Sequence, residues 1–143
     1  MTPGEYCEAL AASRHGPHDD ATTIGVARLA GEAVRFLNYA TGPAAVGLTE
    51  PATAYHLAGE LTTAVYRLPQ LLSQLADWLT AQAASGRLAD TAGRPPGQVT
   101  DAACTALSEA MDHADRLARA LAAAQNLTAG LYLTTPDAEG DPR

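Results

Sequence analysis

The feature that most constrains the fold is a repeat of apolar residues in the middle of the chain, spaced alternately four and three residues apart. Its members are Ala54, Ala58, Leu61, Val65, Leu68, Leu72, Leu75 and Leu79. This heptad spacing predicts a long amphipathic helix from about Glu50 to Ser85. A flanking row widens the stripe on one side: Leu57, Ala64, Leu71 and Trp78. A stripe of this width indicates contact with two neighbouring helices, so we expect a bundle of at least three.

Pro69 lies inside this segment. A proline in a helix interior costs about 3 kcal/mol and usually kinks or ends the helix. The repeat nevertheless stays in phase from Leu68 to Leu72, which favours one kinked helix. Two helices that meet at Pro69 are the alternative.

A second heptad repeat follows a turn-rich connection at 86–98. Its members are Ala103, Leu107, Ala110, Ala114, Leu117, Leu121, Ala124, Thr128 and Leu131. Thr100 is the expected N-cap of this helix, and Val99 is placed to contact Cys104 as a hydrophobic staple. The first repeat is mostly Leu and the second alternates Ala with Leu, so the two rows can interdigitate as large against small. Two long helices joined by a short connection are expected to pack antiparallel.

The outer face of the second repeat carries charged residues. Asp112 with Arg116 and Asp115 with Arg119 have the acid-first i, i+4 spacing that favours ion pairs.

Two further helices are expected before the first repeat. Thr2 as N-cap and Pro3 at the first helical position predict a short helix that ends at about Ser13. After a loop, Asp19 or Asp20 caps a helix that reaches Ala40 and stops before Gly42-Pro43. Its apolar side is formed by Val26, Leu29, Ala30, Ala33, Phe36, Leu37 and Ala40. Arg28, Glu32 and Arg35 lie on the opposite side and can pair with one another.

Together these patterns predict an all-α fold: an antiparallel bundle of three long helices plus a short N-terminal helix. We expect one domain over 1–133 and a flexible C-terminal tail over 134–143. The helix from Asp20 to Ala40 is the expected cover for the wide side of the first repeat.

Composition narrows the class of protein. The net charge is −7 and all nine basic residues are Arg, which disfavours binding to nucleic acid or to an anionic membrane. The start lacks the basic and apolar regions of a signal peptide, and no apolar run is long enough to span a membrane. We therefore expect a cytoplasmic protein in which Cys7 and Cys104 are reduced. Both are interpreted as small buried apolar residues.

A loop cluster carries residue types that bind metals: His15, His18, Asp19 and Asp20. Its Gly-Pro context favours a solvated loop whose aspartates cap the next helix. His56, with Glu60 one turn away, and His113 lie on the two long helices, and whether the two histidines meet depends on the register. They are interpreted as independent surface or boundary histidines.

Three other groups of residues have side chains that occur in binding or catalytic sites. Arg87 and Arg94 in the long connection have the chemistry to hold an anion, but Asp90 lies between them and favours a structural role. Glu109 and Asp112 are explained as part of a charged solvent-facing side. The serines lack the context of a nucleophile. No residue is therefore assigned as catalytic, cofactor-binding or metal-binding, and no cofactor is expected.

The aromatic residues are the remaining candidates: Trp78, Tyr66, Tyr55 and Tyr39. Most are expected in the core or at its boundary. Any that stay exposed would mark a partner surface, because Trp and Tyr dominate interface hot spots.

The run from Leu48 to Trp78 (LTEPATAYHLAGELTTAVYRLPQLLSQLADW) and the run from Asp112 to Leu127 resemble small uncharacterised helical proteins of high-GC actinobacteria. The resemblance covers about half of the chain and implies no catalytic or binding residue. Some members occur beside plasmid-type or integrating elements, which implies a link to mobile-element biology.

The function that these observations favour is a non-enzymatic helical bundle that acts through protein–protein interaction, as an adaptor, a regulator or an assembly subunit. Its partner is expected to be a protein or a second copy in a homo-oligomer. The alternative is a bundle that binds a small ligand or a metal through its histidines.

Overall fold

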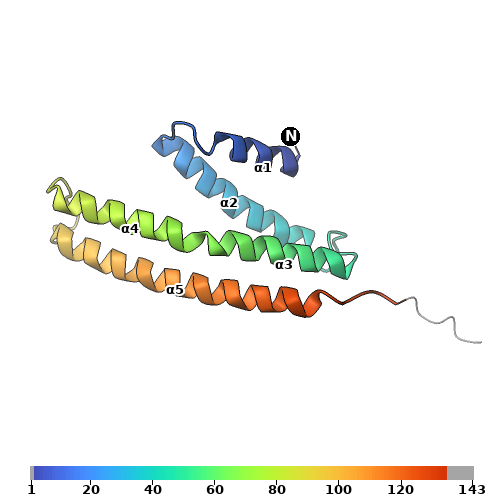
Figure 1. The fold of residues 1–143 in the computed structure, drawn as a ribbon. Coiled ribbons are helices and arrows are strands. Elements are labelled where there is room, and N and C mark those ends of the chain that lie inside the picture. The colour runs from blue at the N-terminus through green and yellow to red at the C-terminus, as the bar shows by residue number, and fades with distance from the viewer. Residues whose placement is uncertain (1, 135–143) are drawn as a thin grey trace, which may run out of the picture. The chain divides into compact units, whose positions relative to one another are not determined.

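The computed structural model describes residues 2–134, and every regular element in that range is an α-helix. The helices are α1 (Pro3–Ser13), α2 (Asp20–Ala40), α3 (Pro51–Tyr66), α4 (Leu68–Ala84) and α5 (Pro96–Thr128) (Figure 1). The predicted all-α class is confirmed. The chain divides into two compact units between Gly47 and Leu48. The predicted tail from residue 135 onward lies outside the described residues.

The first two helices begin at the capping residues that the sequence predicts. Thr2 caps α1 in a reciprocal arrangement with Glu5. The Asp19 side chain accepts a hydrogen bond of 2.7 Å from the backbone N–H of Thr22 at the start of α2. Both helices therefore begin and end as predicted.

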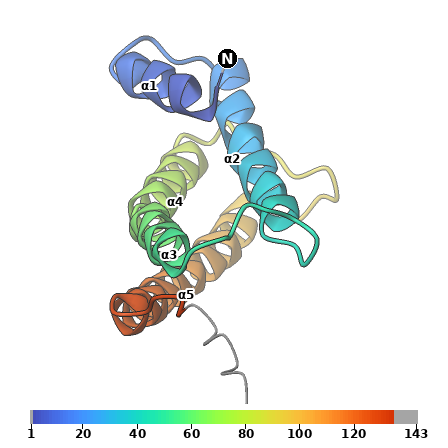
Figure 2. The same ribbon diagram turned by 90° about the vertical axis from the view of Figure 1, so that its right-hand side faces the viewer.

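The long segment around Pro69 is two helices, α3 and α4, joined at the single residue Arg67. The proline lies in the first turn of α4, where its missing N–H disrupts least. The two helices follow one another end to end, and α5 runs beside both of them (Figures 1 and 2). The two helices are joined through Arg67, whose own backbone is helical, so the heptad phase continues across a break of one residue.

The start of α5 also differs from the prediction. The helix begins at Pro96 with no side-chain cap, so Thr100 is not an N-cap and Val99 does not precede the helix. Thr100 is instead buried within α5, with 5% of its surface exposed. Proline at the first helical position, which the sequence shows at Pro96, is the start signal. At the other end, Leu131 lies beyond the helix and is exposed.

In the second unit, α3 and α4 pack against α5 through a seam with regular heptad spacing. On α3 and α4 the buried or half-buried positions that follow this spacing are Pro51, Tyr55, Ala58, Thr62, Val65, Pro69, Leu72, Ala76, Leu79 and Ala83; Ala54, Leu57, Gly59, Leu61 and Gln82 beside them are half-buried too. On α5 the positions with this spacing are Thr100, Cys104, Leu107, Met111, Ala114, Ala118, Leu121, Gln125 and Thr128, and Ala103, Ala110, Asp115 and Ala122 are half-buried beside them. These rows repeat in steps of four and three, as expected for a coiled-coil pair.

The observed seam is rotated relative to the predicted one. Half of the positions agree, such as Leu72 and Leu121, but the other half move by one residue. Leu75 and Leu117 are 45% and 50% exposed, whereas Ala118 beside Leu117 is completely buried. The assignment of Leu68, Leu75 and Leu117 to the seam with α5 is therefore wrong.

Small side chains explain the rotation. Close-packed helices need small residues where their backbones approach most closely, and the buried residues of this seam are Thr62, Thr100, Ala114 and Ala118. The Thr62 hydroxyl is satisfied by donating to the carbonyl of Ala58 at 2.7 Å. At Gly59 a Cβ atom would run into the side-chain amide of Gln125, so a larger residue there would have to displace the end of that side chain.

The first unit contains α1, α2 and the connection to Gly47. The largest apolar side chains of α2 are exposed, among them Ile24, Val34 and Phe36. An ion pair of 3.6 Å joins Glu32 to Arg35, which confirms the predicted i, i+3 pairing on its polar side.

Candidate interaction surface

The register of the second unit follows from contacts at two levels. The Cys104 thiol lies 3.6 Å from the Thr80 hydroxyl and donates to the Ala76 carbonyl at 3.7 Å. At the other end, Gln125 lies beside Gly59. These contacts place α5 antiparallel to α3 and α4, as predicted for the two long repeats.

The rotation of the seam leaves two apolar rows on one side of this pair. Equivalent heptad positions of two antiparallel helices lie on the same side of their seam. The first row, on α3 and α4, consists of Ala54, Leu57, Leu61, Ala64, Leu68, Leu71, Leu75 and Trp78. The second, on α5, consists of Ala103, Ala106, Ala110, His113, Leu117, Ala120, Ala124 and Leu127. We call the two rows together the Leu–Ala face; no position in it is Asp, Glu or Arg.

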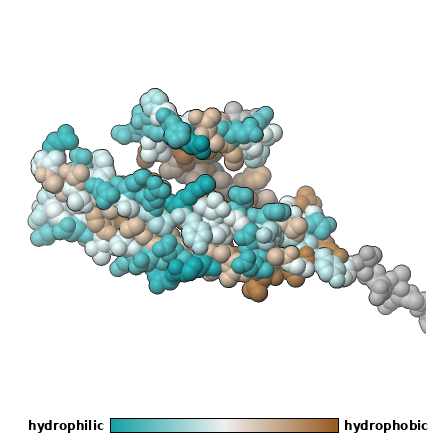
Figure 3. All heavy atoms as spheres, viewed as in Figure 1, coloured by the Kyte–Doolittle hydropathy of each residue, from teal (hydrophilic) through white to brown (hydrophobic). Residues whose placement is uncertain are grey.

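The opposite side of the pair is polar. It carries His56, Thr63, Tyr66, Gln70, Ser73, Asp77, Thr80, Asp101, Thr105, Ser108, Asp112, Asp115, Arg119 and Asn126. In the view of Figure 3, the surface of α3 to α5 is mostly hydrophilic or neutral. The second unit is therefore amphipathic as a whole, with one apolar and one polar side.

Most large side chains of the Leu–Ala face are exposed, whereas Leu57 and Leu61 are half-buried. Leu71 is 58% exposed and Trp78 is 57% exposed, and both lie on α4. Tyr66 and Tyr39 are also exposed, while Tyr55 is half-buried with its ring edge-on to that of His56. The expectation that most of these aromatic residues lie in the core or at its boundary is wrong. The exposed aromatic residues of this set are therefore Trp78, Tyr66 and Tyr39.

In the loop before α2, the histidines and Asp19 form hydrogen bonds with nearby residues of the same segment. His15 accepts a hydrogen bond from the Arg14 side chain at 3.1 Å, and His18 contacts the Arg14 carbonyl at 3.3 Å. Hydrogen bonds from Thr22 lower the pKa of Asp19, consistent with its capping role. Over residues 2–134, no group of three or more His, Cys, Asp or Glu side chains is arranged to hold a metal ion.

The histidines of the long helices do not meet. The register places His113 level with Leu71, so His113 and His56 are about 22 Å apart along the pair. The His113 ring lies 2.9 Å from the Arg116 guanidinium. Of the predicted i, i+4 ion pairs on α5, neither Asp112–Arg116 nor Asp115–Arg119 forms within the described residues. Arg116 turns to His113 instead.

The two cysteines differ in their surroundings. Cys104 is half-buried in the seam between α4 and α5, but Cys7 is exposed on α1. The interpretation of Cys7 as a buried apolar residue is wrong, because no residue of α1 is buried.

The connection between α4 and α5 is tied by its charged residues. The Arg94 guanidinium donates two hydrogen bonds to the Asp90 carboxylate, at 2.8 and 3.0 Å, and the backbone N–H groups of Ala92 and Arg94 donate to the same carboxylate. Arg87 donates to Gln82 at 3.2 Å. Both arginines are thus engaged in holding the loop, with Gly86 and Gly93 at the positive φ angles that its turns require.

This loop should respond to acid. The hydrogen bonds from Arg94 hold the pKa of Asp90 below its ordinary value of 3.8, so the carboxylate stabilises the loop above that value and the effect is lost as the pH falls through the lowered pKa. The amide NMR shifts of Ala92 and Arg94 should be constant above pH 5 and move together with a midpoint below 3.8. Asp90→Asn should abolish that transition. A midpoint above 3.8 would contradict the bidentate pairing.

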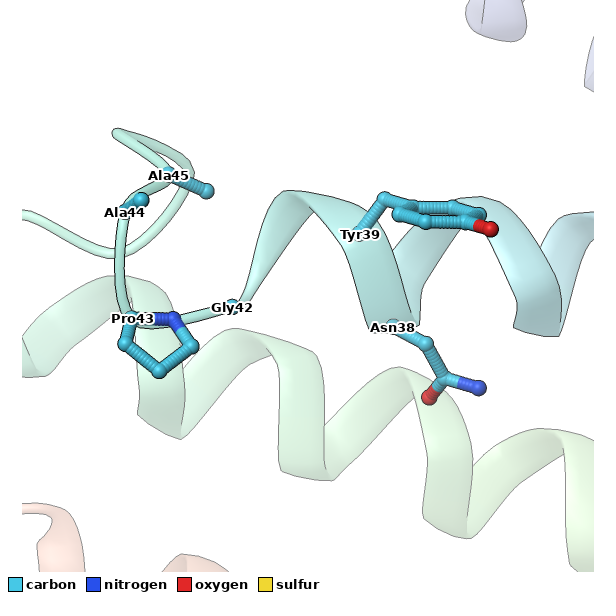
Figure 4. Close-up of a pocket in the computed structure, with 6 residues that line it drawn as sticks. All are labelled: Asn38, Tyr39, Gly42, Pro43, Ala44 and Ala45. Atoms are coloured by element: carbon cyan, nitrogen blue, oxygen red, sulfur yellow. The ribbon is translucent and has the colours of Figure 1, made fainter.

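Two shallow depressions on the described surface do not resemble enclosed ligand sites. One is lined by Asn38, Tyr39 and the turn 42–45, and Figure 4 shows these side chains pointing in different directions around an open bend. The other lies among Asp112, Asp115, Arg116 and Arg119 on the outer side of α5.

Comparison of the chain with protein-family models, with curated proteins and with solved structures finds no match. Among the described helices, none combines the length and the apolar character needed to cross a membrane.

Proposed function

We propose that this protein is a non-enzymatic interaction protein, an adaptor, regulator or assembly subunit, that acts through the Leu–Ala face. The observation that supports the proposal is an apolar side of the α3–α4–α5 unit with no charged position, on which Leu71 and Trp78 remain more than half exposed. By helix geometry, its length of about 36 Å and its width of about 18 Å give roughly 650 Å². The largest apolar patch on a typical monomer is about 300–600 Å², and larger ones mark interaction sites.

On this proposal, a further layer of helix covers the Leu–Ala face. The three-long-helix bundle expected from the sequence is one form of that layer, with α2 as the added helix. The link to mobile elements and the cytoplasmic location, both expected from the sequence, belong to this proposal. The −7 charge supports a protein partner over nucleic acid.

Matched capture experiments test this proposal. Leu71→Glu places a charge in the middle of the Leu–Ala face, while Ser73→Glu places the same charge on the polar side of α4. Proteins retained from a native lysate by the wild type and by Ser73→Glu, but lost with Leu71→Glu, are bound through the face. Identical retention by all three would show that the face is not the interaction surface.

A further inference from the structure

We infer that the Leu–Ala face carries a pH switch at His113: the face binds its partner while this imidazole is neutral and releases it when the imidazole gains a proton. The inference rests on the proposed function, because it names the regulation of the same surface. It is carried by the position of His113 in the face and by the contact between its ring and Arg116.

Among the residues of the Leu–Ala face, all of which lie in the described part of the chain, only His113 can ionise. In the register set by the two contacts between the helices, it lies level with Leu71, midway along the face. Leu71 is 58% exposed, and His113 is exposed as well. A charge on this ring is therefore a charge in an otherwise apolar surface.

The contact with Arg116 defines the protonation state of the ring. Nδ1 of His113 lies 2.9 Å from Nη2 of the Arg116 guanidinium. A guanidinium is always charged and can only donate hydrogen bonds, so Nδ1 accepts this one and carries no proton. The imidazole is therefore neutral in this arrangement, with its single proton on Nε2. A second proton breaks the hydrogen bond and sets two cations side by side.

The charged groups around His113 do not offer a counter-charge inside the face. Those within about one turn of it on α5 are Glu109, Asp112, Asp115 and Arg116. Glu109 and Arg116 lie seven residues apart on one solvent-facing row of α5, before and after His113, so their charges offset each other at the ring.

The facing helices add little charge near the ring. On α3, on α4 and at the residue between them, the charged residues are Glu60, Arg67 and Asp77. Asp77 lies on the polar side, and Glu60 is level with Ala124, about 17 Å from His113 along the pair. Arg67, one turn away, carries the same sign as a protonated imidazole. No carboxylate of the facing helices therefore lies beside the ring.

Covering the face acts against protonation of His113. A partner with an apolar surface removes water from the ring, and a charge without a counter-charge is far more costly to remove from water than a neutral imidazole that keeps its hydrogen bond. Binding and protonation therefore compete. Since imidazoles in general titrate near about pH 6.5, the partner should bind above this range, and binding should weaken as the pH falls through it.

Nile red, a neutral dye that fluoresces on apolar surfaces, tests the inference on the full chain. The signal that counts is the part that Leu71→Glu removes, because this residue lies level with His113. For the wild type, the Kd for the dye should rise roughly 10-fold from pH 8 to pH 5.5, through the cost of a charge in the site. The acid transition of Asp90 lies below pH 3.8 and does not enter this window.

Two replacements hold His113 in one state or the other. His113→Gln keeps an acceptor for Arg116 but takes no proton, so dye binding should be equally strong at both pH values. His113→Lys is charged throughout this window, so binding should be roughly 10-fold weaker than that of the wild type at pH 8, at both pH values. His56→Gln, at an exposed position on the polar side of α3, is the matched control and should keep the pH dependence of the wild type.

The ring geometry is checked on the unmodified protein. The ¹⁵N NMR shifts of the two ring nitrogens distinguish the imidazole tautomers, and at pH 8 the proton of His113 should be on Nε2. A proton on Nδ1 is incompatible with the Arg116 contact and overturns the inference.

Two other results also overturn it: equal dye binding by the wild type at both pH values, or a pH dependence that His113→Gln retains. In either case, dye binding at pH 8 that Leu71→Glu removes still supports an open Leu–Ala face, and the proposed function stands. A wild type that binds no dye at pH 8 does not present an open face, and then the proposed function fails together with the inference.

Discussion

Replacing Ala118 with leucine should lower the free energy of unfolding by about 1–3 kcal/mol, the usual cost of overfilling a packed core. Ala118 is completely buried in the seam between α5 and its neighbours. The larger side chain must push the helices apart or adopt a strained rotamer. Urea unfolding followed by circular dichroism at a fixed protein concentration measures the change, and the melting temperature should fall by roughly 4–8 °C for each kcal/mol.

Ala123→Leu is the matched control for this variant. Ala123 is exposed on the same helix, and alanine and leucine have nearly equal helix propensities. Its stability should stay within about 0.5 kcal/mol of the wild type. If both variants unfold like the wild type, α5 does not pack through Ala118, and the rotated seam is incorrect.

Pro69→Ala should have the opposite sign and raise the free energy of unfolding by up to about 2 kcal/mol. The proline ring conflicts with the carbonyl four residues earlier, at Val65, and alanine is about 3 kcal/mol better inside a helix. Part of this gain is offset, because Pro69 is half-buried against α5 and proline restricts the unfolded chain by about 0.4–1 kcal/mol. The expected result is a continuous helix through Arg67, seen as increased helical ellipticity.

Pro51→Ala provides the comparison. Pro51 stands at the first position of α3, where no helical hydrogen bond is lost to the ring, so the change in stability should be small. If Pro69→Ala leaves the ellipticity unchanged while the protein stays folded, packing against α5 sets the break at Arg67, and the proline does not.

The helices themselves were predictable from local chemistry. Thr2, Asp19 and Pro51 begin helices because a capping side chain or a fixed φ angle satisfies the first turn. The start of α5 was missed because Thr100 is a good cap by type. Pro96, three residues after Gly93, is also a start signal, and the structure uses it.

The seam was only half predictable, and the reason is physical. At several positions along the heptad repeats, two adjacent residues are both apolar, such as Leu75 with Ala76 and Leu117 with Ala118. Hydropathy selects the leucine, but closely approaching backbones accept only the smaller neighbour. The sequence gives the repeat length of such a stripe. Which of the two adjacent residues enters the seam depends on how closely the partner helix packs.

The candidate site follows from that same ambiguity. The width of the stripe around Leu71 and Trp78 indicated a second neighbour, and in the structure these side chains do lie outside the seam. The local roles of Asp19 and Asp90 were also indicated by position, as a helix cap and as the acid between two arginines. What no pattern in one chain contains is which residue of α5 lies level with Trp78, because that depends on the register between the helices.

The fully buried residues of the α3–α4–α5 unit are alanine and threonine, and these side chains bury little apolar area. The exposed leucines and Trp78 therefore contribute little burial energy when α5 packs against α3 and α4. The thermal stability of this protein should then depend on the concentration of the protein and of its partners. It should rise with protein concentration, or with that of any partner that covers the leucines, by mass action.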